Sequence, residues 1–427
     1  MFKRNLETLI KELLDEFRIV YLTGPRQSGK TTLVQLVGKN LDMKYLTLDD
    51  KAVLSAVEND PQSFIQSFKN QNIVLDEFQY SPQLIPAIKQ ASDQLSNKHK
   101  GKFLLTGSAD IFKSAKVQEA LPGHMARLEL YPLSISELTQ QPINIIDYLI
   151  TGHFDKGSDL TVSKQQVADW IISGGYPEVQ SKSHKGQSMW FKSYLQGRLL
   201  KDFETLYTAR GDYQAKLSAL IAYLSGLCGN LLKYANVSND LEIDDKSVKT
   251  YINILELMFI VKTIPAYLKN RAKRQATRMP KLHFVDTGLA CYLLGLKNYE
   301  QLVYSQYFGR LFENLVFMEL TKHTQWAIND VSLYHFRDKR KNEVDIVLEQ
   351  NNGQIIGVEI KASATVGIKD FKGLTKLAEF AGNKFSHGVV FYTGANILPF
   401  HQESIRMYAL PVGLLILTLL DNTVHSG

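Results

Sequence analysis

Short apolar runs alternate with stretches of helical periodicity through the first third of the chain. The runs fall within residues 18–22, 44–50, 72–77, 102–109 and 127–134, and the helical patterns within 6–17 and 31–39. The runs are rich in β-branched and aromatic residues with little polar alternation, which is typical of parallel strands buried on both faces. We therefore expect residues 1–140 to fold as an α/β domain, an αβα sandwich around a doubly wound parallel sheet.

The pattern changes after residue 140. Residues 141–210 predict a helical lid and linker, and helical periodicity at 212–228 and 247–257 is followed by a strand at 259–264. Helix, turn, helix and hairpin together predict a winged helix over residues 211–300. A helix from 307 and strands at 343–349 and 356–361 then predict a further α/β domain over residues 301–427.

Composition narrows the class of protein. A chain of 427 residues is longer than a single hydrophobic core usually supports, so several domains are expected. A content of 44% hydrophobic and 22% charged residues is typical of a globular protein. The net charge of +6 permits nucleic-acid contact without requiring it. Cys228 and Cys291 are too isolated for a zinc site and suit a reducing compartment, so a cytoplasmic location is expected.

Neither end of the chain predicts a membrane anchor. The N-terminal stretch is interrupted by charge, unlike a signal peptide. The longest apolar run, at 409–420, is too short to cross a bilayer and is interpreted as a buried strand. We therefore expect no membrane partner.

Residues 24–31 fit the phosphate-binding pattern G-x-x-x-x-G-K-[ST] between a predicted strand and a predicted helix. In this context the backbone N–H groups surround a phosphate at a helix N-terminus. Lys30 is expected to reach the β- and γ-phosphates of ATP, and Thr31 to bind Mg²⁺. The predicted nucleotide-binding residues here are Gly24, Pro25, Arg26, Gln27, Ser28, Gly29, Lys30, Thr31 and Thr32.

Two later strands end in residues that suit the same site. Asp76 and Glu77 follow an apolar run; Asp76 is expected to hold Mg²⁺, and Glu77 to polarise the attacking water. Thr106 and Ser108 end the next run and are expected to contact the γ-phosphate or the water. Taken singly, acids at a strand end or a Thr-Gly-Ser turn have ordinary structural explanations.

These motifs resemble a prokaryotic family of AAA-type ATPases with a C-terminal domain of unknown function. The resemblance rests on Gly24-Pro25-Arg26-Gln27, Leu75-Asp76-Glu77, Leu105-Thr106-Gly107-Ser108, Leu130-Tyr131-Pro132-Leu133-Ser134, Ser173-Gly174-Gly175-Tyr176-Pro177-Glu178, Phe284-Val285-Asp286-Thr287-Gly288-Leu289 and Glu343-Val344-Asp345. Leu121-Pro122-Gly123-His124 stands where the family usually has Gly-Arg, so Arg26 and Arg127 are both kept as candidates for an arginine finger. A homo-oligomer is a further expectation.

A basic segment lies in the predicted hairpin. Lys269, Arg271, Lys273, Arg274, Arg278 and Lys281 occur there without an acidic residue and with Tyr267 alongside. Such a cluster suits contacts with nucleic-acid phosphates. The alternative is a solvated hairpin or a spacer between domains.

Carboxylates gather in the predicted C-terminal domain. Strand alternation places Glu359 and Lys361 on one face, and a hairpin would bring Asp345 beside them. Together with Glu313 they could bind Mg²⁺, while Lys361 orients or deprotonates water for phosphodiester hydrolysis. The arrangement resembles the restriction-endonuclease-like fold, although E-x-K on a strand is also a common surface ion pair.

Two functions fit these observations. In the first, ATP hydrolysis drives a nucleic-acid-processing C-terminal domain with nuclease activity. In the second, ATP controls a regulatory switch whose nuclease-like domain only binds. DNA and RNA remain equally open as substrates.

Overall fold

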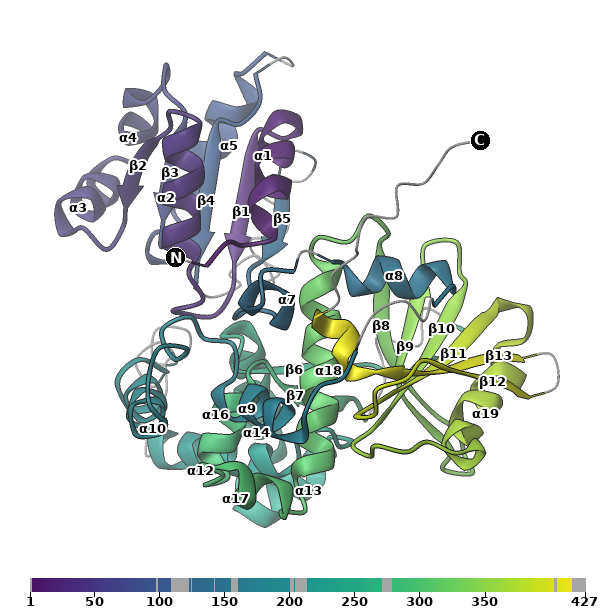
Figure 1. The fold of residues 1–427 in the computed structure, drawn as a ribbon. Helices are drawn as coiled ribbons and strands as arrows, with labels where there is room; N and C mark the ends of the chain where they lie inside the picture. The colour runs from purple at the N-terminus through teal and green to yellow at the C-terminus, as the bar shows by residue number, and fades with distance from the viewer. Residues whose placement is uncertain are drawn as a thin grey trace, which may run out of the picture. The chain divides into compact units, whose positions relative to one another are not determined.

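The computed structural model describes residues 2–96, 99–108, 123, 125–141, 143–154, 160–199, 203, 213–270, 279–402 and 405–416 (Figure 1). The chain forms two compact units. Unit 1 comprises Met1–Pro132 with Leu257–Ile260, and unit 2 comprises Leu133–Glu256 with Val261–Gly427.

Unit 1 is built on a five-stranded parallel sheet with the order β2-β3-β4-β1-β5. The parallel α/β sheet expected from the apolar runs is confirmed. Because β4 lies between β1 and β3, the ends of all three strands meet at one edge. The strands are β1 Ile19–Thr23, β2 Lys44–Thr47, β3 Ile73–Asp76, β4 Phe103–Gly107 and β5 Met125–Glu129.

Helices cover both faces of this sheet because its strands bury alternate side chains in opposite directions. Tyr21, Leu75 and Leu105 face a core shared with the helices α3 to α5. On the opposite face, a Cβ at Gly38 of α2 would lie 2.9 Å from Val74, so the helix packs tightly on β3. The helices are α1 Leu6–Glu16, α2 Lys30–Asn40, α3 Lys51–Asn59, α4 Pro61–Ser67, η1 Phe78–Tyr80 and α5 Leu84–Asp93.

The first part of unit 2 is helical and contains one antiparallel strand pair, β6 with β7. A helix, α13, lies between the two helical patterns that the sequence predicted at 212–228 and 247–257. The elements are α7 Ile135–Leu138, α8 Ile145–Thr151, α9 Lys164–Ser173, α10 His184–Ser193, η3 Tyr194–Leu199, α12 Tyr213–Gly226, α13 Tyr234–Leu241, α14 Asp245–Leu257, β6 Val261–Ile264, β7 Lys281–Phe284, α16 Thr287–Leu293 and α17 Tyr299–Val303.

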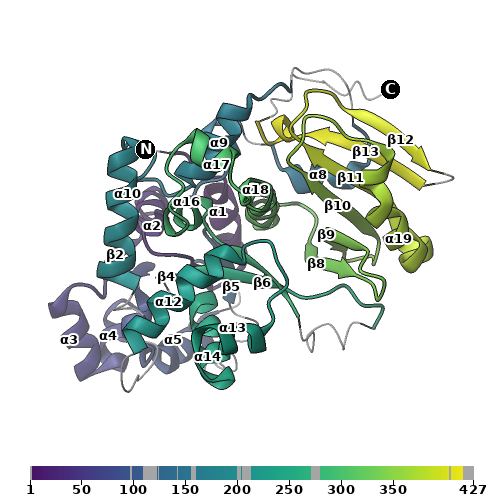
Figure 2. The same ribbon diagram turned by 90° about the horizontal axis from the view of Figure 1, so that it is seen from below.

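The second part of unit 2 is a mixed sheet with the order β12-β13-β11-β10-β9-β8 (Figure 2). β8, β9 and β10 are antiparallel neighbours, whereas β10, β11 and β13 run parallel. The elements are α18 Phe308–Thr324, β8 Val331–Arg337, β9 Glu343–Gln350, β10 Ile355–Lys361, η4 Ile368–Phe371, α19 Lys372–Ala381, η5 Gly382–Lys384, β11 Phe385–Tyr392, β12 Leu398–Gln402, β13 Ile405–Pro411 and η6 Val412–Ile416.

The long apolar run near the C-terminus is only partly a strand. Its first residues belong to β13, which ends at Pro411, and η6 follows as a 3₁₀ helix. Within the described part of the chain, no helix combines the length and apolar character needed to cross a membrane.

Candidate functional site

The loop from Gly24 to Gly29 joins β1 to α2 at the carboxyl edge of the unit 1 sheet. Gly24 has φ +152°, and a Cβ there would lie 2.1 Å from the Leu130 carbonyl oxygen, so only glycine fits this approach. Gly29 adopts φ 97°, a left-handed conformation, directly before the helix. The Ser28 hydroxyl is buried and has no hydrogen-bond partner within the described residues.

Lys30 begins α2 and is only 4% exposed. Its ammonium donates to the carbonyl oxygens of Gly24 at 2.9 Å and of Pro25 at 2.8 Å. Neutral carbonyls are weaker acceptors for an ammonium than phosphate oxygens are. The orphaned hydroxyl and this exchangeable ammonium fit a nucleotide phosphate. Of the other predicted residues, Arg26, Gln27 and Thr31 are half-buried and Thr32 is exposed.

Asp76 is the last residue of β3 and is only 2% exposed. One carboxylate oxygen accepts the Tyr45 hydroxyl at 2.8 Å, and the other accepts the Thr106 hydroxyl and the Glu77 N–H. Burial, together with the hydrogen bond to Asp76, raises the pKa of Tyr45 to about 12, so this hydroxyl remains a donor. Thr106 thus connects β4 to the acidic end of β3.

Glu77 follows in a left-handed conformation, with φ 57°. The side-chain amide of Gln79 donates both to the Glu77 carboxylate and to the Ser108 hydroxyl, the latter at 2.9 Å. The Ser108 N–H returns a hydrogen bond to Gln79 at 3.1 Å. Gln79 therefore links Glu77 to Ser108 through hydrogen bonds. Its position in the sequence gave no indication of this role.

Arg4 is a second residue that the sequence analysis missed. Its guanidinium is buried and donates to the carbonyl oxygens of Ser28 at 2.6 Å and Tyr131 at 2.7 Å. These two bonds fix the phosphate-binding loop to the segment that follows β5. A lone arginine just before an N-terminal helical pattern gives no sequence signal for this role.

The two arginine-finger candidates both have partners within unit 1. Arg26 donates to the Tyr80 hydroxyl at 2.9 Å and lies 6.0 Å from the centre of its ring. Arg127 forms an ion pair with Glu129 at 2.9 Å. The identity of an arginine finger stays a prediction.

The structure brings the predicted carboxylate cluster of unit 2 together. Asp345 lies on β9, Glu359 and Lys361 on β10, and Glu313 on α18. Lys361 binds Glu359 with an N–O distance of 2.8 Å, and Asp345 accepts the Ile360 N–H at 2.9 Å. Antiparallel pairing of Val358 with Ile346 produces this approach.

The prediction that Lys281 belongs to a basic hairpin tip is wrong. It is the first residue of β7, only 7% exposed, and its ammonium lies 2.5 Å from Glu313 Oε1 and 2.8 Å from Asp345 Oδ1. It therefore belongs to the carboxylate cluster, where it cannot contact a phosphate at the same time. Sequence composition could not show that this lysine points inward.

The other residues of the predicted basic segment differ in their exposure to solvent. Tyr267 is buried against Tyr334 in the core of the mixed sheet, so it is unavailable for stacking on a base. Lys269 is exposed and lies 5.0 Å from the centre of the Phe380 ring. The predicted residues Arg271, Lys273, Arg274 and Arg278 lie outside the described residues.

In the structure, the ammonium of Lys281 lies between the carboxylates of Glu313 and Asp345. Over the part of the chain described here, no group of three or more His, Cys, Asp or Glu side chains is placed to hold a metal ion. Burial raises the pKa of both Glu313 and Glu359 to about 8, and the negative charge of Asp345 is the second cause of this rise. Burial lowers the pKa of Lys281, but the carboxylates of Asp345 and Glu313 outweigh it and raise that pKa overall. Metal binding by Glu313, Asp345 and Glu359 stays a prediction.

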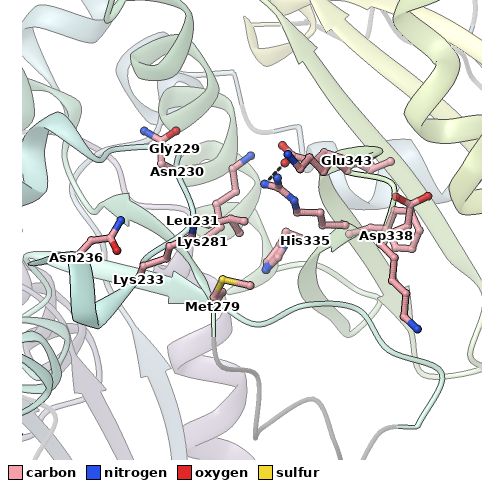
Figure 3. Close-up of a pocket in the computed structure, with 15 residues that line it drawn as sticks. Gly229, Asn230, Leu231, Lys233, Asn236, Met279, Lys281, His335, Asp338 and Glu343 are labelled. Atoms are coloured by element: carbon pink, nitrogen blue, oxygen red, sulfur yellow. Dashed lines mark ion pairs between the residues drawn. The ribbon is translucent and has the colours of Figure 1, made fainter. Parts of the chain in front are cut away.

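A cavity of about 520 Å³ lies beside this cluster (Figure 3). Its lining includes Lys281 together with three exposed lysines, Lys233, Lys339 and Lys341. His335 also lines it, and its Nε2 is buried without a hydrogen-bond partner among the described residues. Burial and the charge of Lys281 lower the His335 pKa to about 4, so the ring is neutral near pH 7.

The acidic side chains that line the cavity already have ion-pair or hydrogen-bond partners. Arg337 forms an ion pair with Glu343, drawn as a dashed line in Figure 3. Asp338 accepts the backbone N–H of Asn342 at 2.8 Å and its side-chain amide at 2.7 Å, which closes the β8–β9 turn. Lys341 occupies this turn with φ 64°, a conformation that is costly for a side chain of this size. The cavity is therefore positively charged overall.

Two motifs that carried the family resemblance meet at Asp286. Its buried carboxylate caps α16 by accepting the Leu289 N–H at 2.9 Å and accepts the Gly175 N–H at 2.7 Å. A Cβ at Gly174 would lie 2.2 Å from this carboxylate, which explains the glycine there. Burial raises the pKa of Asp286. These motifs therefore have a structural role.

The parallel sheet, the phosphate-binding loop and the paired acids define the N-terminal part as an AAA-type P-loop ATPase domain, as predicted. Residues 16–139 match the family model described as AAA domain. Residues 164–300 and 308–415 match two models described as domains of unknown function, DUF8612 and DUF4143.

Similar proteins cover most of the chain. An uncharacterized protein of Mycobacterium tuberculosis is 25% identical over 366 residues, which are 86% of this chain and 75% of that protein. One of Methanocaldococcus jannaschii is 23% identical over 394 residues, covering 87% and 81%. Among solved structures, a Walker-type ATPase of Pyrococcus abyssi aligns with 12% identity and a TM-score of 0.43, over 69% of this chain and 96% of that one.

Proposed function

We propose that the protein hydrolyses ATP and couples hydrolysis to the binding of nucleic acid by its C-terminal domain. The P-loop supplies the binding step: Lys30 exchanges its carbonyl acceptors for phosphate oxygens. Mg²⁺ would neutralise phosphate charge beside Thr31 and Asp76. Glu77, held by Gln79, accepts a proton from the attacking water.

The order of elements supports a restriction-endonuclease-like C-terminal domain. α18 precedes three antiparallel strands, β8 to β10, and α19 then leads to β11, which is parallel to β10. Asp345 lies on β9, and Glu359 and Lys361 lie on the neighbouring strand β10. A winged helix at α13, α14 and the β6–β7 pair completes the proposed architecture.

The positively charged cavity is the main observation in favour of nucleic-acid binding. Lys233, Lys339 and Lys341 form no ion pair with any residue that the structure describes, so their charge is available to phosphates. The cavity also borders the carboxylate cluster through Lys281. A phosphodiester bound there would lie next to the residues expected to process it.

Replacing Lys233, Lys339 and Lys341 together with glutamine should weaken nucleic-acid binding. Each lost phosphate contact lowers the slope of log affinity against log salt by about 0.9 for duplex DNA. The triple variant should therefore bind on the order of a hundredfold more weakly at about 0.1 M salt. Fluorescence anisotropy with labelled duplex and single-stranded oligonucleotides over a salt series measures both quantities.

The matched control replaces three exposed lysines that do not line the cavity, Lys185, Lys297 and Lys384. Lys341→Asn is a second test, because asparagine tolerates the left-handed backbone and removes only the charge. It should bind more weakly without a lower Tm. Equal affinity and slope in the cavity and control variants would refute the proposal.

A regulatory switch is the second candidate function. The ion pairs of Lys281 favour it, because they hold Glu313 and Asp345 in a form without a metal-ligating group. In this case nucleic acid binds but is not cut. Incubation with plasmid and single-stranded substrates, with Mg²⁺ or Mn²⁺ and with or without ATP, tests the switch, because cutting of either substrate would exclude it.

A further inference from the structure

The ammonium of Lys281 lies where a cation shared by two carboxylates would lie. It contacts Glu313 Oε1 at 2.5 Å and Asp345 Oδ1 at 2.8 Å, and its side chain is 9% exposed. The second Asp345 oxygen is already bound to the Ile360 N–H. A divalent ion bridging Glu313 and Asp345 would therefore compete with Lys281 for the same oxygens.

The neighbouring lysine does not occupy this position. Lys361 binds one oxygen of Glu359, and the other Glu359 oxygen is buried with no hydrogen-bond partner among the residues described. The cluster thus holds three carboxylates and two ammonium groups, of which only Lys281 bridges two acids. A divalent cation entering beside Lys281 would meet strong repulsion at short range.

We infer that Lys281 is the resident cation of the carboxylate cluster and excludes divalent metal from it. The wild-type chain then binds Mg²⁺ or Mn²⁺ weakly at Glu313 and Asp345. Withdrawal of this one ammonium turns the same oxygens into a site for a hard divalent cation, which prefers carboxylate ligands. This inference concerns cation choice and holds whether or not nucleic acid binds.

The test is Mn²⁺ titration of the full chain by calorimetry, with Asp76→Asn in every variant to silence the nucleotide site. Lys281→Met should bind Mn²⁺ at least tenfold more tightly than the Asp76→Asn parent. Its Tm should be lowered without metal, because buried carboxylates lose their partner, and should rise on adding Mn²⁺. Adding Asp345→Asn to Lys281→Met should abolish the gain.

Lys361→Met is the matched control. It also removes an ammonium from the cluster but leaves Lys281 in place, so Mn²⁺ affinity should stay at the level of the parent. If Lys281→Met binds Mn²⁺ no better than the parent, the inference is wrong. Should that variant fail to fold, Lys281→Gln removes the same charge but keeps a hydrogen-bond donor for the two acids, and it should also bind Mn²⁺ more tightly than the parent.

The parent itself provides an independent measurement. Millimolar Mn²⁺ should leave its Tm unchanged. A rise in Tm that disappears in Asp345→Asn would overturn the inference, because metal would then bind beside Lys281. Failure of the nucleic-acid proposal would instead appear only in the oligonucleotide experiments.

Discussion

Glu77→Gln is expected to abolish most ATP turnover while leaving ATP binding intact. Glutamine has nearly the same shape and can still contact Gln79, but it cannot accept a proton from water. Loss of a general base lowers the rate by roughly 10²- to 10⁴-fold. Phosphate release under steady-state conditions measures turnover, and a fluorescent ATP analogue measures binding.

Lys30→Ala provides the contrasting result. It removes the ammonium that would contact the phosphates, so binding and turnover should fall together. Turnover at the wild-type rate in Glu77→Gln would exclude Glu77 as the base. Glu77→Gln should retain the Tm of the wild-type chain, since Glu77 is half-buried. Because Lys30 is buried, circular dichroism should confirm that Lys30→Ala is folded before its binding is measured.

Asp286→Ala is expected to cause a large loss of stability in unit 2. The substitution leaves the buried N–H groups of Gly175 and Leu289 without their acceptor and opens a small void. Each unsatisfied buried group costs about 1–3 kcal/mol, so a total of roughly 3–5 kcal/mol is expected. Differential scanning calorimetry should show the transition of this unit lowered by on the order of 10 °C.

The control for this variant is Ser163→Ala. Ser163 caps α9 by accepting the Gln166 N–H at an exposed position, so its loss should cost only about 1 kcal/mol. Asp286→Asn should fall between the two, because it keeps one acceptor oxygen. Equal stability of Asp286→Ala and Ser163→Ala would show that the carboxylate does not hold the two motifs together.

The sequence predicted best where local pattern and burial agree. Strands buried on both faces read as continuous apolar runs, so the parallel sheet of unit 1 was predictable and is confirmed. The β9–β10 hairpin and the approach of Asp345 to Glu359 also follow from alternation and one turn. Each of these depends on neighbours close in the chain.

Other features depend on contacts between distant segments and leave no local signal. Lys281 reads as part of a basic run, yet it becomes buried because α18 and β9 present carboxylates to it. Arg4 reaches the carbonyls of Ser28 and Tyr131, which are far along the chain. The apolar run at 409–420 was misread as one strand because periodicity cannot show where β13 ends.

The carbonyl acceptors of Lys30 bear on the energetics of nucleotide binding. Before a phosphate enters, its ammonium already has two hydrogen bonds, to Gly24 and Pro25. We therefore expect ATP binding to exchange acceptors at this lysine, so that hydrogen bonds to phosphate are offset by the loss of those to the two carbonyls. Much of the affinity for ATP should therefore come from the attraction between charges. Raising the ionic strength should then increase the Kd for ATP and leave the binding enthalpy nearly unchanged.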